Sequence, residues 1–212
     1  LNGMALVAQM IERRQLEWGL VVDGESSRHV VERTLDRLAD PGSTPQTLRD
    51  NIATLTLGSG AAAAVLARAD LAPAGHRFVG LVSRAATEHN HLCRGQTDWM
   101  HTDTTGLLTA GLDLASDTWA RAAETLGWTV GALDHAVLHQ VSKVHTEQIA
   151  GRLGLPLERV PLIYPEHGNV GPASVPMTLA KAAEAGRLER GDRVGLMGIG
   201  SGLNCAMAEV VW

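Results

Sequence analysis

Aromatic residues and basic clusters are scarce in this sequence of 212 residues, and both absences argue against nucleic acid as a partner. Phe, Trp and Tyr together make up only 3% of the chain, which leaves little for base stacking. Lys and Arg number 18 against 23 Asp and Glu, and no run of basic residues is present to neutralise a phosphate backbone. The abundant alanine and glycine are instead typical of helices packed closely on a sheet.

Cysteine and long apolar runs are also in short supply. Cys93 and Cys205 lie far apart in the sequence and do not form a disulfide framework, so we expect a reducing, cytoplasmic environment. Cys205, inside a strand-like segment, should be inert packing. The apolar stretches are too short to cross a bilayer, and the first residues do not resemble a signal peptide. The sequence therefore predicts no integral membrane segment.

Strand-like and helix-like segments alternate along the chain, which predicts an α/β layered fold. Apolar runs bounded by turn residues predict strands over 18–24, 55–66, 78–83, 133–138, 193–197 and 204–211. Helical periodicity predicts helices over 1–14, 105–126, 143–153 and 172–185. Residues 30–53 are polar and mixed, and Pro41 and Pro45 mark them as a loop. Residues 84–106 hold many histidines and show no clear period, so they are also expected to be a loop. The second and third strands should be neighbours, and the last two should pair antiparallel because the turn between them is short.

The first predicted helix has no capping residue before it. Leu1, Met4 and Ile11 share one apolar face, yet no Ser, Thr or Asp precedes them. We interpret this pattern as a chain that begins in the middle of a domain. An uncapped, frayed native terminus is the alternative.

His139 follows the buried run Ala136-Val-Leu138 and is a candidate catalytic residue. A side chain that leaves the end of an interior strand points into a cleft more often than into the core. Imidazole also exchanges protons and donates hydrogen bonds near neutral pH. A hydrogen-bonded structural histidine is the alternative interpretation.

Two glycine-rich segments add to the candidate site. Asn169 lies between Gly168 and Gly171 where a loop meets a helix, and it is either a functional amide or a simple turn former. The segment Gly198-Ile-Gly-Ser-Gly202 precedes a strand rather than a helix, which argues against a dinucleotide site. Its backbone N–H groups could face a developing oxyanion, or its glycines could serve an ordinary hairpin turn.

The alternating residues His89, His91 and Cys93 would share one face of an extended segment, a pattern that zinc can use. A closed zinc site needs a fourth ligand, and His101 is the only near candidate, so we predict no metal site. Cys93 could instead be a nucleophile with His139 as its base. However, nothing around Cys93 resembles a helix N-terminus that would lower the pKa of its thiol.

Taken together, these segments resemble the ketoacyl synthase III branch of the thiolase superfamily, and most closely the OleA-type enzymes of long-chain olefin biosynthesis. His139-Gln-Val-Ser142 resembles the His-Gln motif of that family, and residues 168–176 resemble its Gly-Asn motif. Residues 198–204 resemble its C-terminal glycine loop, and residues 57–65 resemble its small-residue strand turn. The resemblance covers essentially the whole chain.

This resemblance implies a thiolase-like layered fold (αβαβα). Residues 1–99 would be the remainder of the N-terminal half, and residues 100–212 would be the complete C-terminal half. In the family, the helix that resembles residues 1–14 directly follows the nucleophilic cysteine, where the helix dipole favours the thiolate. The nucleophile is therefore expected just before Leu1, outside this chain.

The resemblance also implies roles for three residues. His139 and Asn169 would donate hydrogen bonds to the thioester oxygen of an enolate-like state, and the backbone N–H of Ser201 would stabilise the oxyanion of the acyl intermediate. Synthase III members often have Gly at the position of Ser201, but the backbone donor is unchanged. Ser142 stands where those synthases usually have Asn, which favours the OleA-type branch.

By resemblance, the reaction would be a head-to-head condensation of two long-chain fatty acyl-CoAs. It would proceed without decarboxylation, through an acyl-cysteine, to a 2-alkyl-3-oxo acid. A glutamate of the partner subunit removes the α-proton in the family, and it lies outside this chain. Coenzyme A thioesters would be the substrates, with no separate cofactor.

Two alternatives remain beside this reaction. The first is a decarboxylative condensation with a malonyl thioester, as in 3-oxoacyl-ACP synthase III. The second is a non-catalytic partner subunit of a heterodimeric condensing enzyme. The resemblance further implies a homodimer, or a heterodimer with a related thiolase-fold chain, and contact with downstream olefin-pathway enzymes.

Overall fold

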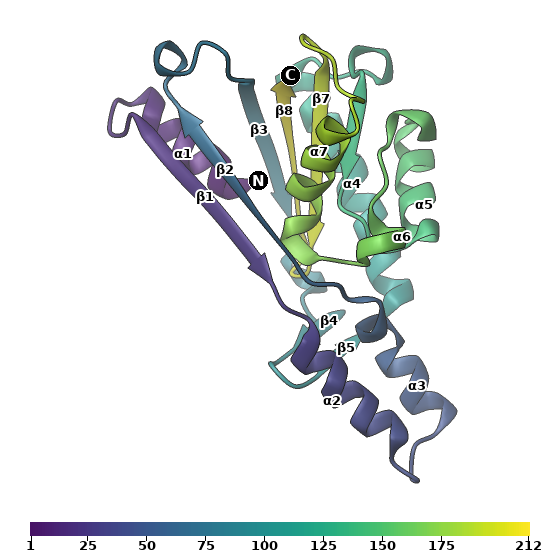
Figure 1. Ribbon diagram of the computed structural model, residues 1–212. Coiled ribbons are helices and arrows are strands. Elements are labelled where there is room, and N and C mark those ends of the chain that lie inside the picture. Colours follow the sequence, from purple (N-terminus) through teal and green to yellow (C-terminus); the bar gives the residue numbers. More distant parts are fainter.

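A four-stranded mixed sheet lies at the centre of the computed structural model, which describes residues 1–212 (Figure 1). Its strand order is β3 (Arg77–Ala85), β8 (Asn204–Val211), β7 (Arg193–Gly200) and β6 (His135–Leu138). β8 runs antiparallel to both of its neighbours, whereas β6 and β7 are parallel. The predicted antiparallel pairing of the last two strands is confirmed.

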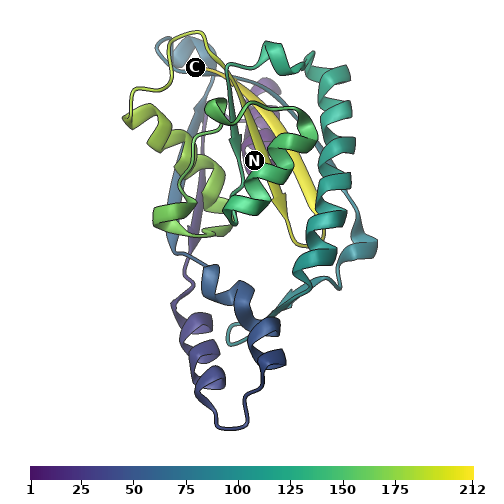
Figure 2. The same cartoon turned by 90° about the vertical axis from the view of Figure 1, so that its right-hand side faces the viewer.

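Helices cover both faces of this sheet, because successive side chains along each strand point to opposite faces. Leu138, Met197 and Met207 face one way and pack with α4 (Thr104–Leu126) and α5 (Lys143–Leu153). Val137, Leu196 and Ala208 face the other way and pack with α7 (Ser174–Glu184). Figure 2 shows α7 and α4 on opposite sides of the sheet. The predicted helices over 105–126, 143–153 and 172–185 are therefore confirmed, with small shifts at their ends.

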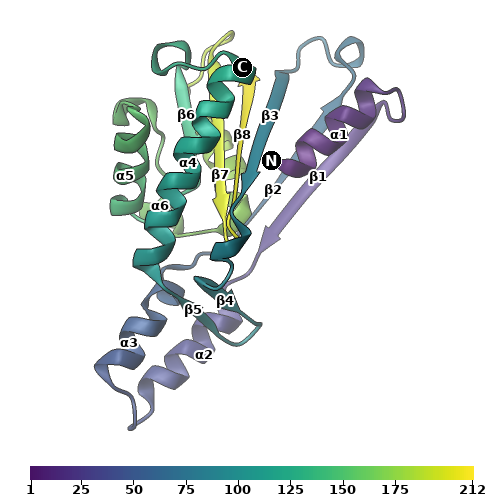
Figure 3. The ribbon, with the colours of Figure 1, turned by 180° about the vertical axis from the view of Figure 1, so that it is seen from behind.

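A second sheet consists of β1 (Trp18–Glu25) and β2 (Gly60–Ala67), paired antiparallel over their full length. Helix α1 (Asn2–Glu12) packs on its inner face, where Val7 fills the space above Gly19. Helix α7 also reaches this sheet, because Met177 packs against Gly60. Helices α1 and α7 therefore lie between the two sheets, which gives four layers in the order α, β, α, β (Figure 3).

The outer face of the β1–β2 sheet carries no helix layer within residues 1–212. Leu20, Val22 and Val65 point outward from it and are 62%, 66% and 68% exposed. The expected αβαβα arrangement has a fifth layer at this place. The described residues thus supply four of the five expected layers, and the apolar outer face marks where the fifth would pack.

The prediction that 55–66 and 78–83 form neighbouring strands is wrong. Residues 52–56 are a short 3₁₀ helix, and β2 begins only at Gly60. β2 pairs with β1, whereas β3 pairs with β8 from the far end of the sequence. Apolar runs predict strands but not their hydrogen-bond partners, and both of these strands prefer partners distant in sequence. β3, which begins at Arg77, belongs to the sheet of β6, β7 and β8, so the strands of the two sheets separate along the chain before residue 77. The predicted domain boundary at residue 99 stays a prediction.

The prediction of a loop over 30–53 is also wrong. Two helices, α2 (Arg28–Ala39) and α3 (Pro45–Asn51), form a hairpin that projects beyond both sheets (Figure 1). Thr44 caps α3 through a reciprocal pair of hydrogen bonds with Thr47, and Pro45 takes the first helical position. Pro45 was interpreted as a loop marker, but it is pre-organised for a helix start.

The remaining elements are short. Residues 84–106 are not all loop, because β4 (Cys93–Gly95) and β5 (Met100–Thr102) form a small antiparallel hairpin. Helix α6 spans Tyr164–His167. The 3₁₀ turns are η1 (Ile52–Thr56), η2 (Ala69–Leu71), η3 (Thr87–His89), η4 (Val130–Ala132), η5 (Leu157–Arg159) and η6 (Gly171–Ala173). No helix combines the length and the apolar character that a membrane span requires.

Candidate active site

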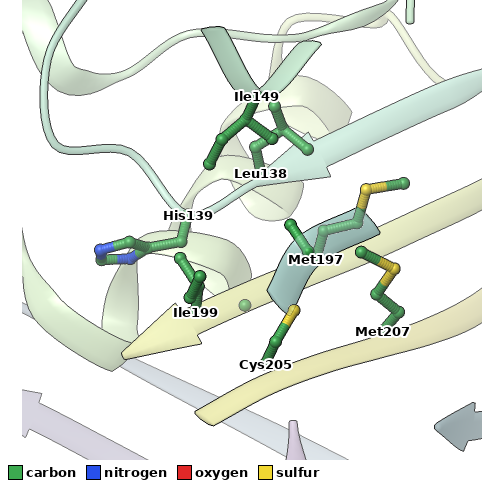
Figure 4. Close-up of a pocket in the computed structure, with 9 residues that line it drawn as sticks. Leu138, His139, Ile149, Met197, Ile199, Cys205 and Met207 are labelled. Carbon is green, nitrogen blue, oxygen red and sulfur yellow. The ribbon is translucent and has the colours of Figure 1, made fainter. Parts of the chain in front are cut away.

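His139 is the first residue after β6 and lies at the carboxyl end of two parallel strands. Its backbone N–H donates to the carbonyl of Met197 on β7 at 2.7 Å, which extends the ladder by one bond. Beside it, a small cavity of about 10 Å³ is lined mainly by apolar side chains, among them Leu138, Ile149 and Met207 (Figure 4). The position predicted from the sequence, at the end of a buried strand, is confirmed.

Burial controls the charge of His139. It lowers the pKa of the imidazole to about 4, with a further lowering from His145, while the backbone of Gly171 acts in the opposite direction. The ring is therefore neutral at neutral pH. A neutral imidazole donates one hydrogen bond without carrying a positive charge, which suits a donor to an enolate oxygen.

His145 is a second, half-buried imidazole that was not among the predicted site residues. The hydroxyl of Ser142 accepts the backbone N–H of His145 at 3.3 Å and caps α5, which places His145 in the first helical turn. The His139 and His145 rings lie edge to face with centroids 6.4 Å apart. Burial also lowers the pKa of His145 to about 4, and its Nδ1 has no hydrogen-bond partner. The N-cap spacing from Ser142 was the signal for this placement.

Gln140 links the end of β6 to the segment that leads to Asn169. Its side chain is fully buried, and its amide nitrogen donates to the carbonyl of Pro161 at 2.8 Å. Its amide oxygen accepts the backbone N–H groups of Ile163 at 2.8 Å and Tyr164 at 3.1 Å. Three hydrogen bonds from one buried amide hold this segment against the strand that carries His139, a role that the sequence alone did not indicate.

Asn169 is held by its own backbone. Its N–H donates to Thr56 at 2.9 Å, and its carbonyl accepts from Gly58 at 2.8 Å. Its side-chain Oδ1 accepts the N–H of Gly171 at 3.1 Å. With the acceptor end of the amide occupied, the Nδ2 group remains as a donor. The turn therefore fixes both the place of Asn169 and the direction of its free donor.

Glycine is required where the two loops meet. A Cβ at Gly58 would lie 1.8 Å from the carbonyl oxygen of His167. A Cβ at Gly168 would lie 2.7 Å from the carbonyl oxygen of Thr56, and Gly168 also has a positive φ of 67°. The small-residue segment beginning at Leu57 therefore serves to let the Asn169 loop approach.

The peptide of Gly171 brings the two candidate side chains together. Its N–H binds the Oδ1 of Asn169, and its backbone interacts with the ring of His139. His139 and Asn169, 30 positions apart in the sequence, therefore both lie against Gly171. The Nδ2 donor of Asn169 beside a neutral imidazole is an arrangement that is able to stabilise a negatively charged oxygen.

Ser201 lies exposed in the turn between β7 and β8. Because β6 and β7 are parallel, this turn stands at the same edge of the sheet as His139. Gly198 and Ile199, just before it, line the small cavity with His139 (Figure 4). The structure thus puts the Ser201 turn near the candidate pair, and the role of its backbone N–H stays a prediction.

A larger cavity of about 230 Å³ opens beside Asn169. It is lined by Leu57, Gly58, Asn169 and Gly171, and by Trp99 and Met100 of the segment that forms the β4–β5 hairpin. Glu25, the last residue of β1, completes the wall. Burial, and secondly the charge of Asp23, raise the pKa of the Glu25 carboxyl above its usual value. Glu25 carries no recognisable sequence signal, because an acidic residue at a strand end is common.

The two cysteines lie in different settings. Cys93 is on β4 and its sulfur lies 3.5 Å from the Thr102 hydroxyl; it lines neither cavity. Cys205 is buried beside His139, and burial raises the pKa of its thiol to about 11, so it stays protonated. The packing role predicted for Cys205 agrees with this setting. No group of three or more His, Cys, Asp or Glu side chains in the chain could hold a metal ion.

The first residue of the chain also lies near this site. Leu1 packs beside Gly198 of β7, with its Cδ1 3.4 Å from the point where a Cβ would stand on that glycine. The N-terminus of α1 therefore points toward the strand ends that carry the candidate residues.

Comparison with known proteins identifies relatives of the whole chain. Residues 123–212 match the family model for the C-terminal part of 3-oxoacyl-[acyl-carrier-protein] synthase III. The chain is 51% identical over its full length to the acyl-CoA:acyl-CoA alkyltransferase of Xanthomonas campestris pv. campestris, of which it covers 63%. It is 36% identical to the protein of that name from Shewanella oneidensis, of which it covers 64%. The β-ketoacyl-[acyl-carrier-protein] synthase III of Pseudomonas aeruginosa is 27% identical over 99% of this chain.

Solved structures agree. A cysteine-to-serine variant of Xanthomonas campestris OleA, with bound lauric acid and lauroyl-CoA, superposes with a TM-score of 0.97 at 52% identity. It covers all of this chain, which spans 63% of that protein. The 3-oxoacyl-(acyl carrier protein) synthase III of Xanthomonas oryzae gives a TM-score of 0.96 at 52% identity, and this chain spans 62% of it. The thiolase-like layered fold is confirmed, and so is the predicted resemblance of the chain to the ketoacyl synthase III-like branch of the thiolase superfamily and to the OleA proteins.

Proposed function

We propose that the protein containing this chain joins two long-chain fatty acyl-CoAs head to head, without decarboxylation, to a 2-alkyl-3-oxo acid. The observation that carries this proposal is the convergence of His139 and Asn169 on the peptide of Gly171, beside a cavity of about 230 Å³. The chain is also more similar to acyl-CoA:acyl-CoA alkyltransferases, at 51% identity, than to the Pseudomonas synthase III, at 27%.

In the first step, a cysteine directly before Leu1 would attack the thioester carbon of one acyl-CoA. A carbon–sulfur bond forms to the cysteine, the bond to the coenzyme A sulfur breaks, and coenzyme A leaves. The position fits, because Leu1 packs beside Gly198 and the N-terminus of α1 favours a thiolate. The backbone N–H of Ser201 would donate to the oxyanion at this stage.

In the second step, a second acyl-CoA would bind with its thioester oxygen facing His139 and Asn169. A base, assigned by the family resemblance to a glutamate of the partner subunit, takes the α-proton. The resulting carbanion attacks the acyl-cysteine, and the cysteine thiolate leaves. Neutral donors suit this step because a charged imidazolium would compete to protonate the enolate.

A decarboxylative condensation with a malonyl thioester is the second candidate. The family model that matches residues 123–212 and the Xanthomonas oryzae structure, 52% identical, both bear the synthase III name. The same donors would serve this reaction, with carbon dioxide rather than a proton leaving the α-carbon. We also propose that the protein works as a dimer in the cytoplasm, as a homodimer or with a related thiolase-fold chain.

One experiment separates these candidates. The intact protein is supplied with a long-chain acyl-CoA alone, and free coenzyme A and coupled products are followed by mass spectrometry. A β-keto acid, or the ketone it decomposes to, without any malonyl thioester supports the head-to-head condensation. Coenzyme A release without a coupled product supports the malonyl reaction. No release at all supports a non-catalytic subunit.

A further inference from the structure

The proposed condensation leaves one chemical step without an assigned residue. Coupling two acyl-CoAs releases only the coenzyme A that leaves when the cysteine is acylated. The coupled chain is still a thioester of the second coenzyme A. A free 3-oxo acid therefore requires one water molecule and a group that accepts a proton from it. The Asn169 amide cannot accept a proton, and His139, whose pKa is lowered to about 4 by burial, is a poor proton acceptor, so neither suits this role.

Glu25 is the only titratable side chain that lines the cavity beside Asn169. Its carboxyl group packs against Gly171, where a Cβ would lie 3.1 Å from the carboxyl carbon and 3.4 Å from Oε2. The same glycine binds the Oδ1 of Asn169 through its N–H. Glu25 and Asn169 therefore reach one peptide from the same cavity.

We propose that Glu25 is the general base that activates water to release the coupled product from coenzyme A. The inference rests on the proposed function, because it assigns the last step of that reaction. The cavity of about 230 Å³ has room for water beside the carboxylate. Partial burial and the neighbouring Asp23 raise the pKa of Glu25, which makes it a better proton acceptor than an ordinary surface carboxylate.

The step balances as an ordinary thioester hydrolysis. Glu25 takes one proton from water while the water oxygen forms a bond to the thioester carbon. The negative charge develops on the carbonyl oxygen, where His139 and Asn169 already donate hydrogen bonds. The carbon–sulfur bond then breaks, the coenzyme A sulfur leaves with the electron pair, and the proton held by Glu25 passes to it. One donor pair thus serves both the enolate and the hydrolysis intermediate.

The first test supplies the intact protein with a long-chain acyl-CoA and measures whether the coupled product is released as a free acid or as a coenzyme A thioester. Wild type should release two coenzyme A molecules per coupled product and incorporate one oxygen from labelled water. Glu25→Gln should release one and accumulate the coupled 3-oxoacyl-CoA. Glu17→Gln is the matched control, because Glu17 is an exposed carboxylate at the other end of β1. Wild-type amounts of free acid from Glu25→Gln would overturn the assignment.

The second test bypasses condensation. A synthetic 2-alkyl-3-oxoacyl-CoA is given directly to each variant, and its hydrolysis is measured. Glu25→Gln should hydrolyse it about 100-fold or more slowly than wild type, and Glu25→Asp should recover part of the rate. Equal hydrolysis by wild type and Glu25→Gln would overturn the inference, whatever happens in coupling. If wild type hydrolyses this thioester in a Glu25-dependent way but never couples acyl-CoAs, the inference stands and the proposed condensation falls.

Discussion

The candidate site has two walls that differ in polarity. The first, which we call the apolar wall, consists of Leu138, Ile149 and Met197 around His139. The second, the polar wall, consists of the Asn169 turn, Gly171 and Glu25, and it opens on the larger cavity. The apolar wall lowers the pKa of its histidine, whereas the polar wall retains a free amide donor and a carboxylate. Burial therefore fixes the charge of the imidazole on the apolar wall, and under the proposed function the cavity beside the polar wall would admit substrate and water.

The largest effect should follow removal of the donor on the apolar wall. His139→Ala should lower condensation at least about 100-fold, because it removes a preorganised hydrogen bond to the enolate oxygen. The fold should persist, since the backbone of residue 139 keeps its bond to Met197. Rates are read as coupled product per unit time, and circular dichroism checks the fold. A wild-type rate in this variant would remove His139 from the mechanism.

A comparable but separable loss should follow a change on the polar wall. Asn169→Asp keeps an oxygen to accept the N–H of Gly171 but replaces the Nδ2 donor with negative charge. Condensation should fall by about 100-fold, while the first release of coenzyme A remains. Rapid-quench measurement of the two steps shows the difference. Equal loss of both steps would mean that Asn169 acts in acylation or holds the fold.

These two walls show what the sequence could and could not predict. The places of His139 and Asn169 in the fold were predictable because each ends or interrupts a recognisable pattern, a buried strand for one and a glycine-flanked turn for the other, whereas their catalytic roles stay a prediction from the family resemblance. The partners that fix them were not. Gln140 reaches Pro161, and Glu25 reaches Gly171, across long stretches of chain that no periodicity records. Contacts of this kind depend on which strands pair, and the pairing of β2 and β3 was one part of the fold predicted wrongly.

The close approach of the two loops on the polar wall gives a test of stability. Gly58→Ala places a methyl group 1.8 Å from the carbonyl oxygen of His167, so the backbone must shift. Unfolding free energy should fall by about 1–3 kcal/mol. Gly131→Ala is the control, because a Cβ there meets nothing within 4 Å. Thermal denaturation compares the two, and equal stability would show that the Asn169 loop adapts freely.

A further expected effect concerns the pH dependence of the apolar wall. Both His139 and His145 have a pKa lowered to about 4 by burial, while an unfolded histidine has its ordinary value of about 6.5. Between these values the unfolded chain binds more protons than the folded one, so stability falls as pH falls from about 6.5 to about 4. Each histidine contributes a slope of at most about 1.4 kcal/mol per pH unit.

His145→Phe isolates one of these contributions. Phenylalanine keeps an aromatic ring against His139 but removes one proton site and an imidazole nitrogen, Nδ1, that is buried without a hydrogen-bond partner. The variant should lose less stability than wild type over that pH range and should be no less stable near pH 7, because no hydrogen bond of that nitrogen is lost. Urea unfolding at several pH values measures the slopes. Equal slopes of unfolding free energy against pH in the variant and wild type would mean that His145 is solvated in the folded protein. Burial would then lower the pKa of His139 alone.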